Sequence, residues 1–371
     1  METTGQSHTS SPTDARAWIQ VDLGALVRNG ARLARRAGVP LLPMVKADAY
    51  GLGAVPVARA LETLSPWGFG VATVEEGREL RAAGIARRVL VFTPLLPAEL
   101  PAAHALDLTP TLHRAADIVA WSATGRPWHL AVDTGMNRAG VRWDRVGELA
   151  DTLRAHPPEG VFTHFHSADR ADGSRAQQEA RFGESLGVFP ERPAVLHAEN
   201  SPALERCDGS PWTVARPGVF LYGVESGGGE HAEPVVTLRA RVVDLHDVVD
   251  GETVSYLATW RAAGRRRIAT LALGYGDGYR RALSNRGTAL LHGRRAPVVG
   301  LVTMDMTMVD VTDIPCEVGD VATLIGRDGT CRLGVADVAA TAEVLAYELL
   351  TGLRGRLPRV YVDHQPGGEA A

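Results

Sequence analysis

The chain has 371 residues, of which 45% are hydrophobic and 22% are charged, and its formal net charge is −4. This length is enough for two domains of ordinary size, each with a core of its own. The mild acidity, and the lack of a basic domain with interleaved aromatic residues, exclude a typical nucleic-acid-binding protein.

The N-terminal segment 1–15 is polar and rich in Ser and Thr. It contains no apolar run, so it is predicted to be a disordered tail and not a signal peptide. No stretch of about 18 apolar residues occurs, and no membrane span is expected. Cys207, Cys316 and Cys331 lie far apart without the spacing of metal ligands, which indicates reduced packing residues of a cytoplasmic protein without a metal site.

Short apolar runs alternate with amphipathic segments between residues 16 and 235. Helices are expected after Asp22, which can cap a helix that stops at Gly38, and at 55–64 and 74–84. This alternation favours an α/β fold, most economically an N-terminal (β/α)8 TIM-like barrel. A doubly wound open sheet is the competitor, although no GxGxxG follows an early strand. The predicted strands are 17–23, 41–47, 67–73, 88–93, 128–134, 160–165, 194–199 and 213–218.

A junction is predicted at the glycine-rich segment 225–234, ESGGGEHAEP. The pattern then changes to short segments of alternating apolar and polar residues, as in antiparallel strands. One helix is expected at 334–353. Residues 236–371 are therefore predicted to form a smaller, mostly antiparallel β domain.

Polar residues gather where the predicted barrel strands end, which is where such barrels carry their chemistry. Each has an ordinary structural explanation by itself, such as a surface-reaching lysine or a helix cap. Their joint placement argues for a site, because a helix start and a glycine turn suit a phosphate and a desolvated lysine suits a Schiff base. Together they suggest pyridoxal phosphate. The residues are Lys46, Asp133, Met136, Arg138, His164, His166, Asp169, Asn200, Ser201, Arg216, Gly218 and Tyr222.

Motifs along the chain resemble the successive signatures of the alanine racemase family over roughly residues 18–362. They are PMVKADAYGLG, VDTGMNRAG, FTHFHSAD, HAENSPAL, ARPGVFLYG, TVSYLATW, LGYGDGYRR, LVTMDMTMVDV and LPRVYV. The resemblance implies a pyridoxal 5'-phosphate-dependent isomerase that interconverts L- and D-alanine by two-base proton transfer on an aldimine. It also implies a homodimer with shared active sites, and D-alanine production for the cell wall is one role such an enzyme serves.

The resemblance assigns the two catalytic bases to Lys46 and Tyr256. Lys46 would carry the cofactor and act on one face of the substrate Cα, and Tyr256 of the partner subunit would act on the other. Two bases are needed because racemisation removes a proton on one face and returns it on the opposite face. Arg216 would face the pyridine nitrogen and, because it keeps its proton, would make the cofactor a milder electron sink.

The remaining roles are also implied by the resemblance. His164 would pack on the cofactor ring, and Arg138 and Met304 would bind the substrate carboxylate. The phosphate would be held by Tyr50, Asn200, Ser201, Gly218 and Val219. The entrance for small amino acids would be formed by Asp169, Tyr275, Arg281 and Asp305.

Two positions depart from the family pattern. Ala131 replaces a lysine whose carbamylated side chain orients the arginine, so Arg138 is expected to be held by an anion or by Asn137. Gly355 replaces a tyrosine near the substrate, which predicts tolerance of larger substrates such as serine. The alternatives are a racemase or decarboxylase of other amino acids, including basic ones, and a non-catalytic pyridoxal-phosphate carrier, which would not need the second domain.

Overall fold

The computed structural model describes residues 14–206, 208–229 and 231–363. It divides them into two compact units. We call residues 26–233 the barrel unit, and the described residues up to Ala25 together with those from Pro234 onward the sheet unit. The predicted tail lies almost wholly outside the described residues, and so does Cys207.

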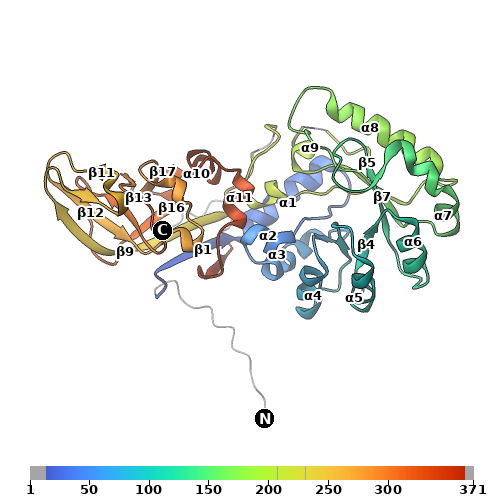
Figure 1. Ribbon diagram of the computed structural model, residues 1–371, viewed down its shortest axis with the longest axis horizontal. Coiled ribbons are helices and arrows are strands. Elements are labelled where there is room, and N and C mark those ends of the chain that lie inside the picture. The colour runs from blue at the N-terminus through green and yellow to red at the C-terminus, as the bar shows by residue number, and fades with distance from the viewer. Residues whose placement is uncertain (1–13, 207, 230, 364–371) are drawn as a thin grey trace, which may run out of the picture. The chain divides into compact units, whose positions relative to one another are not determined.

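A curled sheet of parallel strands forms the centre of the barrel unit, and helices α4 to α8 lie around β4, β5 and β7 (Figure 1). The strands pair in the order β2-β3-β4-β5-β7-β8, and β6 adds to β5. Their bounds are β2 (Phe69–Val71), β3 (Val89–Val91), β4 (Thr109–Leu112), β5 (His129–Asp133), β6 (Val141–Arg142), β7 (Gly160–Phe162) and β8 (Val195–His197). The helices are α1 (Leu23–Ala37), α2 (Lys46–Gly51), α3 (Ala54–Leu61), α4 (Val74–Ala82), α5 (Leu100–Ala105), α6 (Ala115–Ser122), α7 (Ala150–Ala155), α8 (Ser174–Ser185) and α9 (Ser201–Glu205).

Two short segments close this sheet into a barrel. Met44 bridges in parallel to Gly70 of β2, and Leu41 bridges in parallel to Ala215. On the other side, Thr213 donates its N–H to the carbonyl of Leu196 in β8 at 2.9 Å. Residues 41–45 and 213–216 thus complete a ring of eight parallel segments, which confirms the predicted barrel.

The structure differs from the prediction in which segments form that ring. The predicted strand 17–23 is β1 (Ala17–Asp22), which belongs to the sheet unit, where it pairs with β9 and β18. The barrel segment that the sequence did not reveal is β4, whose residues TPTL are all buried although three of them are not strongly apolar. Lys46 therefore ends the first segment of the barrel and not the second.

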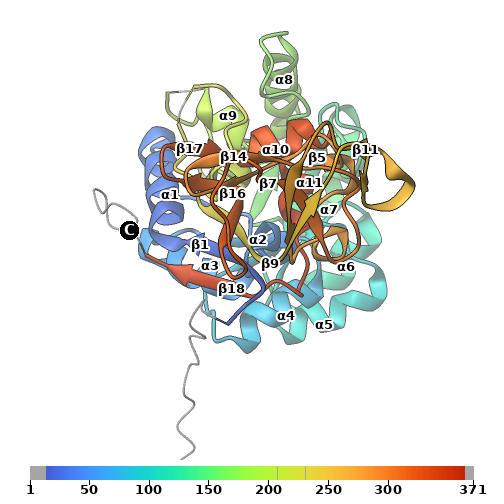
Figure 2. The same cartoon turned by 90° about the vertical axis from the view of Figure 1, so that its left-hand side faces the viewer.

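The sheet unit is mostly antiparallel, as predicted, and the long strand β9 runs through its centre. The strand order is β14-β13-β16-β9-β1-β18, with β12 paired to β9 and β15, and β17 to β16. Figure 2 shows β1 beside β18, its one parallel neighbour among the described strands. The bounds are β9 (Val236–Val248), β10 (Thr253–Val254), β11 (Trp260–Arg261), β12 (Arg266–Leu271), β13 (Thr288–Leu291), β14 (Arg294–Pro297), β15 (Thr307–Asp310), β16 (Val321–Asp328), β17 (Cys331–Leu333) and β18 (Arg359–Val362).

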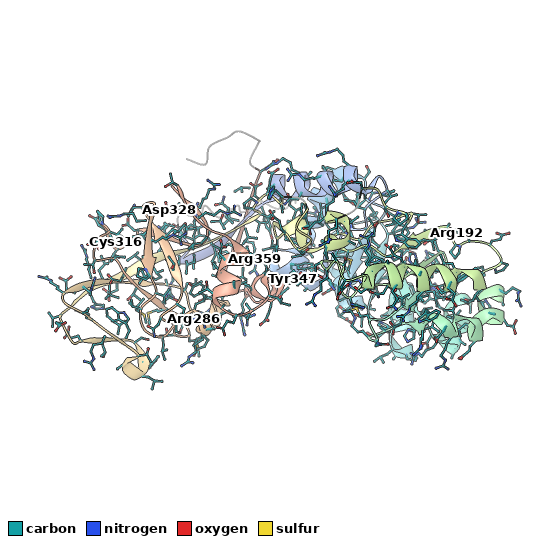
Figure 3. The ribbon with its side chains drawn as sticks, turned by 90° about the horizontal axis from the view of Figure 1, so that it is seen from above. Arg192, Arg286, Cys316, Asp328, Tyr347 and Arg359 are labelled. Carbon is teal, nitrogen blue, oxygen red and sulfur yellow. The ribbon has the colours of Figure 1, made fainter. Side chains whose placement is uncertain are left out.

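The single helix expected at 334–353 is wrong. The structure shows α10 (Val335–Thr341) and α11 (Ala346–Thr351). Between them Glu343 takes a left-handed backbone conformation with φ of 57°, which ends an α-helix. After α11, Arg359, which is labelled in Figure 3, donates to the carbonyls of Arg354 and Leu357 at 2.8 and 2.7 Å.

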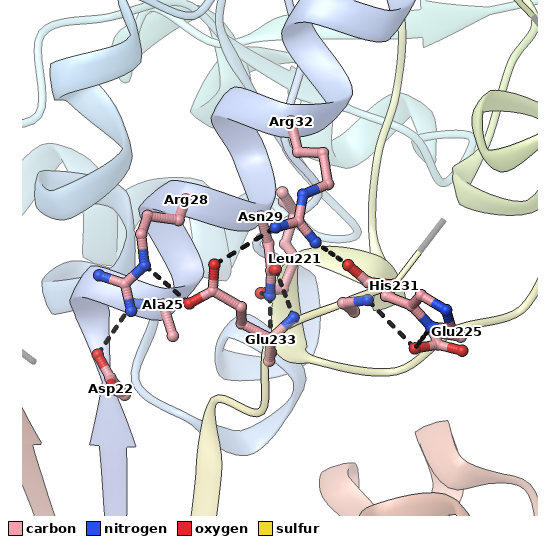
Figure 4. Close-up of polar contacts among 10 residues, drawn as sticks. Asp22, Ala25, Arg28, Asn29, Arg32, Leu221, Glu225, His231 and Glu233 are labelled. Atoms are coloured by element: carbon pink, nitrogen blue, oxygen red, sulfur yellow. Dashed lines mark hydrogen bonds and ion pairs between the residues drawn. The ribbon is translucent and has the colours of Figure 1, made fainter. Parts of the chain in front are cut away.

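Helix α1 begins and ends as predicted. Asp22 accepts a hydrogen bond from the N–H of Ala25 at 2.9 Å, and Gly38 follows with φ of 67°. Within the barrel unit, the buried Asn29 of this helix donates to the carbonyl of Glu233 at 2.9 Å and accepts from its N–H at 2.8 Å (Figure 4). The end of the barrel unit is thereby fixed to its first helix.

None of the described helices is long and apolar enough to span a membrane. Among the described cysteines, Cys316 is buried and Cys331 is half-buried, and both are free thiols.

Candidate active site

Lys46 lines a cavity of about 410 Å³ in the barrel unit, together with Arg138 and His164. Burial is the main cause that lowers the pKa of its amine, and the charges of Arg138 and Arg216 lower the pKa further, while Glu76 raises it. A lowered pKa favours the neutral amine, which is the form that attacks a carbonyl group and accepts a proton. Lys46 is also the only lysine of the chain, whose other Lys or Arg positions are all arginine.

The backbone after Lys46 makes a left-handed turn. Ala47, Asp48, Ala49 and Tyr50 have φ values between 50° and 57°, a conformation that costs roughly 1–2 kcal/mol per non-glycine residue. The carboxylate of Glu76 holds the turn, because it accepts from the N–H of Ala47 at 2.8 Å and from the N–H of Ala72 at 2.6 Å. Such strain is typical of functional sites in which the surroundings impose the geometry.

Arg216 is buried and held on several sides. Its guanidinium donates to the carbonyls of Thr163 at 2.8 Å and Ala198 at 2.9 Å, and to Nδ1 of His197 at 2.9 Å. Its Cζ lies 5.4 Å from the centre of the Phe162 ring. Burial lowers the pKa of Arg216 to about 9, so the group still carries its charge at neutral pH. It is therefore a rigid cation that can only donate.

His164 is neutral at this site. Burial, followed by the charges of Arg216, Arg138 and Lys46, lowers its pKa to about 3. Nδ1 of His164 lies 3.4 Å from a terminal nitrogen of Arg216. Since the arginine donates, Nδ1 is the acceptor and the proton of the ring is on Nε2.

Ser201, Gly218 and Tyr50 come together beside Arg216. The Ser201 hydroxyl accepts from the N–H of Gly218 at 2.8 Å, and Asn200 caps α9 by accepting from Ala203 at 3.2 Å. A Cβ on Gly218 would lie 2.5 Å from the hydroxyl of Tyr50, so only glycine fits there. Tyr50 stacks on Tyr222 with ring centres 4.6 Å apart. Val219 is buried next to this cluster.

These groups fit pyridoxal phosphate. Hydroxyl groups and a glycine backbone form a polar cluster of the kind that receives a phosphate. The depressed-pKa amine of Lys46 lines the cavity and starts the short turn that also carries Tyr50. No group of three or more His, Cys, Asp or Glu residues is placed to hold a metal ion in the described part of the chain.

Arg138 lines the cavity with Ala131, where the family pattern has a lysine. Asn137 was expected as one substitute for that lysine. Its N–H donates to Asp133 at 3.0 Å and its amide donates to the carbonyl of Gly135 at 3.4 Å. The amide nitrogen of Asn137 is therefore engaged within its own turn.

The expected entrance residue of the barrel unit, Asp169, is exposed, and its carbonyl accepts from Arg206 at 2.7 Å. The other predicted site residues belong to the sheet unit. Tyr256 begins the short 3-10 helix Tyr256–Ala258 and is 70% exposed, at a second cavity of about 800 Å³ that also contains Met306.

The other sheet-unit residues are exposed as well. Met304 is 53% and Tyr275 is 39% exposed, and Arg281 lies at the surface. Asp305 accepts from Arg356 at 2.7 Å. The side chains of Tyr256 and Met304 are thus largely exposed in the described chain.

Sequence reasoning missed the polar residues that support the site. Glu76 could have been found, because Thr73 and Glu76 have the spacing of a capping box at the start of a helix. His129, His197 and Glu159 gave no local signal, since each occurs within or beside an apolar strand.

The chain matches two family models. Residues 21–226 match the model described as alanine racemase, N-terminal domain, and residues 235–361 match alanine racemase, C-terminal domain. The alanine racemase of Deinococcus radiodurans is 40% identical over 354 residues, which cover 93% of this chain and 98% of the relative. That of Symbiobacterium thermophilum is 39% identical, with 95% and 98% covered.

Solved structures agree with these matches. Alanine racemase from E. faecalis superposes with a TM-score of 0.89 at 31% identity, covering 94% of this chain and 98% of that one. The enzyme from Bacillus anthracis with bound L-Ala-P gives 0.88 at 30% identity, covering 96% and 97%. The enzyme from Bartonella henselae with covalently bound pyridoxal phosphate gives 0.85 at 28% identity, covering 94% and 100%.

Proposed function

The chain belongs to the alanine racemase family, and from this premise we infer that Lys46 and Tyr256 are the two bases of the reaction. The enzyme is a pyridoxal-phosphate-dependent isomerase that interconverts L- and D-alanine. One observation carries the assignment of Lys46. The only ε-amine of the chain lines the barrel cavity with its pKa lowered by burial and by two arginines.

The bound cofactor supplies an electron sink that stabilises negative charge on the substrate Cα. Lys46 would hold the cofactor through its ε-nitrogen and, when that nitrogen is a free neutral amine, would remove or return a proton on one face of that carbon. Tyr256 acts on the opposite face through its phenol. The pairing of an amine with a phenol provides one base for each direction of turnover.

We assign Tyr256 to the active site of a partner subunit, so that the functional unit is a homodimer. The support is the 70% exposure of Tyr256 and the 53% exposure of Met304, which leaves both available to a second chain. In this proposal the sheet unit completes the partner's site. The backbone N–H of the partner subunit's Met304 binds the substrate carboxylate.

Arg216 is assigned to the ring nitrogen of the cofactor. A group that only donates, and that keeps its charge at neutral pH, leaves this nitrogen unprotonated and so limits how much negative charge the ring withdraws. A weaker electron sink favours racemisation over transamination. Neutral His164 would present its ring face to the cofactor, and the phosphate would be held by Tyr50, Ser201 and the backbone at Asn200, Gly218 and Val219.

Arg138 is assigned to the substrate carboxylate, since it is the arginine among the residues that line the cavity with Lys46. An anion near Ala131 remains our proposal for what orients it. Asp169, Tyr275, Arg281 and Asp305 are assigned to the entrance. We also propose a cytoplasmic location and a role in supplying D-alanine for the cell wall. The free thiols of Cys316 and Cys331 are consistent with a reducing compartment.

The function is tested with purified protein, pyridoxal phosphate and a panel of L-amino acids, with each D-product measured by chiral separation. Fast formation of D-alanine is expected. Turnover confined to basic amino acids, or release of carbon dioxide in place of a D-product, would overturn alanine racemisation. Cofactor binding without any turnover would indicate a carrier protein.

A further inference from the structure

A line of polar side chains crosses the interior of the barrel unit from Arg216 to the start of β7. A terminal nitrogen of Arg216 lies 2.9 Å from Nδ1 of His197, the last residue of β8. Nε2 of His197 lies 2.8 Å from Nδ1 of His129, the first residue of β5. Nε2 of His129 lies 3.6 Å from the carboxylate of Glu159, which directly precedes β7.

The chemistry of the end groups fixes the direction of the two hydrogen bonds in this line. Arginine can only donate, so Nδ1 of His197 accepts and the His197 proton is on Nε2. That proton is donated to Nδ1 of His129, which therefore carries its own proton on Nε2. This last N–H faces the Glu159 carboxylate, and a carboxylate can only accept. The line thus runs from a fixed cation to a fixed anion.

The two atoms at the end of the line have no other partner. Nε2 of His129 and Oε2 of Glu159 are buried and have no hydrogen-bond partner among the described residues. They face each other across 3.6 Å, which is an electrostatic contact and longer than a hydrogen bond. The His129 ring also packs directly against the backbone of Gly160, the first residue of β7. A Cβ on Gly160 would lie 2.5 Å from that ring, so glycine is required at this position.

The imidazoles are enclosed by aromatic rings. The Phe162 ring stacks on His197 with centres 4.8 Å apart, and the Trp67 ring lies 5.4 Å from that of His129. Both histidines are fully buried. Burial lowers the pKa of each, so both are neutral at neutral pH.

We propose that Glu159 is a positioning residue for Arg216. Glu159 acts through His129 and His197, because it fixes the tautomer of each imidazole. Without an acceptor at position 159, the buried N–H of His129 no longer faces a group that can receive it. His129 can then keep a hydrogen-bonded N–H only if its proton moves to Nδ1, from which it is donated to Nε2 of His197. The His197 proton must then be on Nδ1, so that this N–H points at the N–H of Arg216. The two donors repel, and the guanidinium tilts. The role of Arg216 at the cofactor, and hence the effect on catalysis, rests on the proposed function.

The tautomers are tested by nitrogen NMR of the whole protein with 15N-labelled histidine, without cofactor and with it. Signals are assigned with His129→Gln and His197→Gln variants. Both histidines are expected as neutral Nε2–H tautomers that do not titrate between about pH 6 and pH 8. A Nδ1–H tautomer at either position, or titration within this range, overturns the proposal whatever the activity.

The effect on the site is tested with two variants of Glu159. Glu159→Gln keeps a carbonyl acceptor and is expected to retain the tautomers and kcat to within about threefold. Glu159→Met removes the acceptor and is expected to lower kcat about tenfold or more, with KM for alanine changed less than about twofold, because Arg138 binds the carboxylate. The tautomer signals should become mixed in this variant alone.

Arg88→Met is the matched control. Arg88 pairs with the other oxygen of Glu159 at 2.8 Å and lies over the Trp67 ring, so this variant removes the ion pair and leaves the acceptor for His129. It should keep wild-type tautomers and kcat. An equal loss of kcat in Arg88→Met and Glu159→Met would mean that Glu159 acts only through its ion pair with Arg88. That result would contradict the proposal. An inactive wild type with the expected tautomers would instead contradict the proposed function. If Glu159→Met does not fold, the proposal is tested by kcat of Glu159→Gln and by the tautomers of His129 and His197 in the wild type.

Discussion

The carboxylate of Glu76 lies 2.8 Å from the backbone nitrogen of Ala47, the residue that follows the lysine of the cavity. This contact joins the start of helix α4 to a left-handed turn of four non-glycine residues. It also brings a negative charge near the amine, which raises the pKa of Lys46 against the larger effect of burial. Glu76 therefore has both a structural and an electrostatic effect on the site.

Removal of the Glu76 acceptor should destabilise the turn. Glu76→Ala is expected to lower the free energy of unfolding by about 1 kcal/mol, because two backbone N–H groups lose a charged acceptor at a partly exposed position. Glu76→Gln, which keeps one oxygen, should lose less. The measurement is urea unfolding of both variants and the wild type. Identical midpoints for Ala and wild type would show that the turn does not depend on Glu76.

The pKa of Lys46 can be read directly, because no other ε-amine is present. The rate of acylation at Lys46, measured by peptide mapping across pH in cofactor-free protein, should rise at lower pH than in the urea-unfolded chain. Glu76→Gln should lower this pKa further, and Arg138→Met should raise it, since the two charges act in opposite directions. Shifts in the same direction in both variants would contradict the electrostatic account.

The same lowered pKa makes stability depend on pH. The unfolded chain binds the Lys46 proton more tightly than the folded protein does. Stability should therefore rise with pH between the folded and the unfolded pKa of this amine, and the contribution of Lys46 should be flat outside that interval. Lys46→Met is the control, because its unfolding free energy should lack this rise when measured by urea titration at each pH.

Sharing of the site between subunits is tested with mixed dimers, purified through two different tags. A Lys46→Ala chain paired with a Tyr256→Phe chain should regain about half of wild-type activity, because one of the two shared sites is intact. The reciprocal control pairs wild type with the double variant. It should be inactive if sites are shared, and about half active if each chain builds its own site.

Tyr256→Phe by itself should affect the two directions of turnover unequally. The substitution removes the base on one face and leaves Lys46 on the other. Solvent deuterium incorporation into L-alanine and into D-alanine is the measurement, with the wild type as reference. A slight loss that is the same in both directions would mean that Tyr256 is not the second base.

Gly355 predicts a broad substrate range. A Cβ at this position meets no atom within 4 Å, so a larger residue can be introduced without a clash in its own unit. We expect kcat/KM for serine above about one hundredth of that for alanine, which corresponds to discrimination below about 2.7 kcal/mol. Gly355→Tyr should increase the discrimination. A wild-type enzyme that already rejects serine more strongly would refute this prediction.

The sequence by itself predicted the chemistry of this protein. The placement of Lys46 and other polar residues at predicted strand ends suggested pyridoxal phosphate, and the resemblance of the motifs around Lys46, Tyr256 and Arg216 to one family implied their roles. The alternation of strands and helices also predicted the barrel, and the change to alternating β segments predicted the second unit. These patterns are local, because the buried face of a helix or strand appears in the sequence as apolar residues at a regular spacing.

Only the tertiary structure decided which segments pair and which side chains meet across the barrel. An apolar run such as residues 17–22 fits either sheet, and β4 is buried despite its threonines and proline. The contacts of Glu76 with Ala47, and of His197 with His129, join residues far apart in the chain. Such contacts depend on how the strands pair to close the barrel. The local spacing of apolar residues does not predict them.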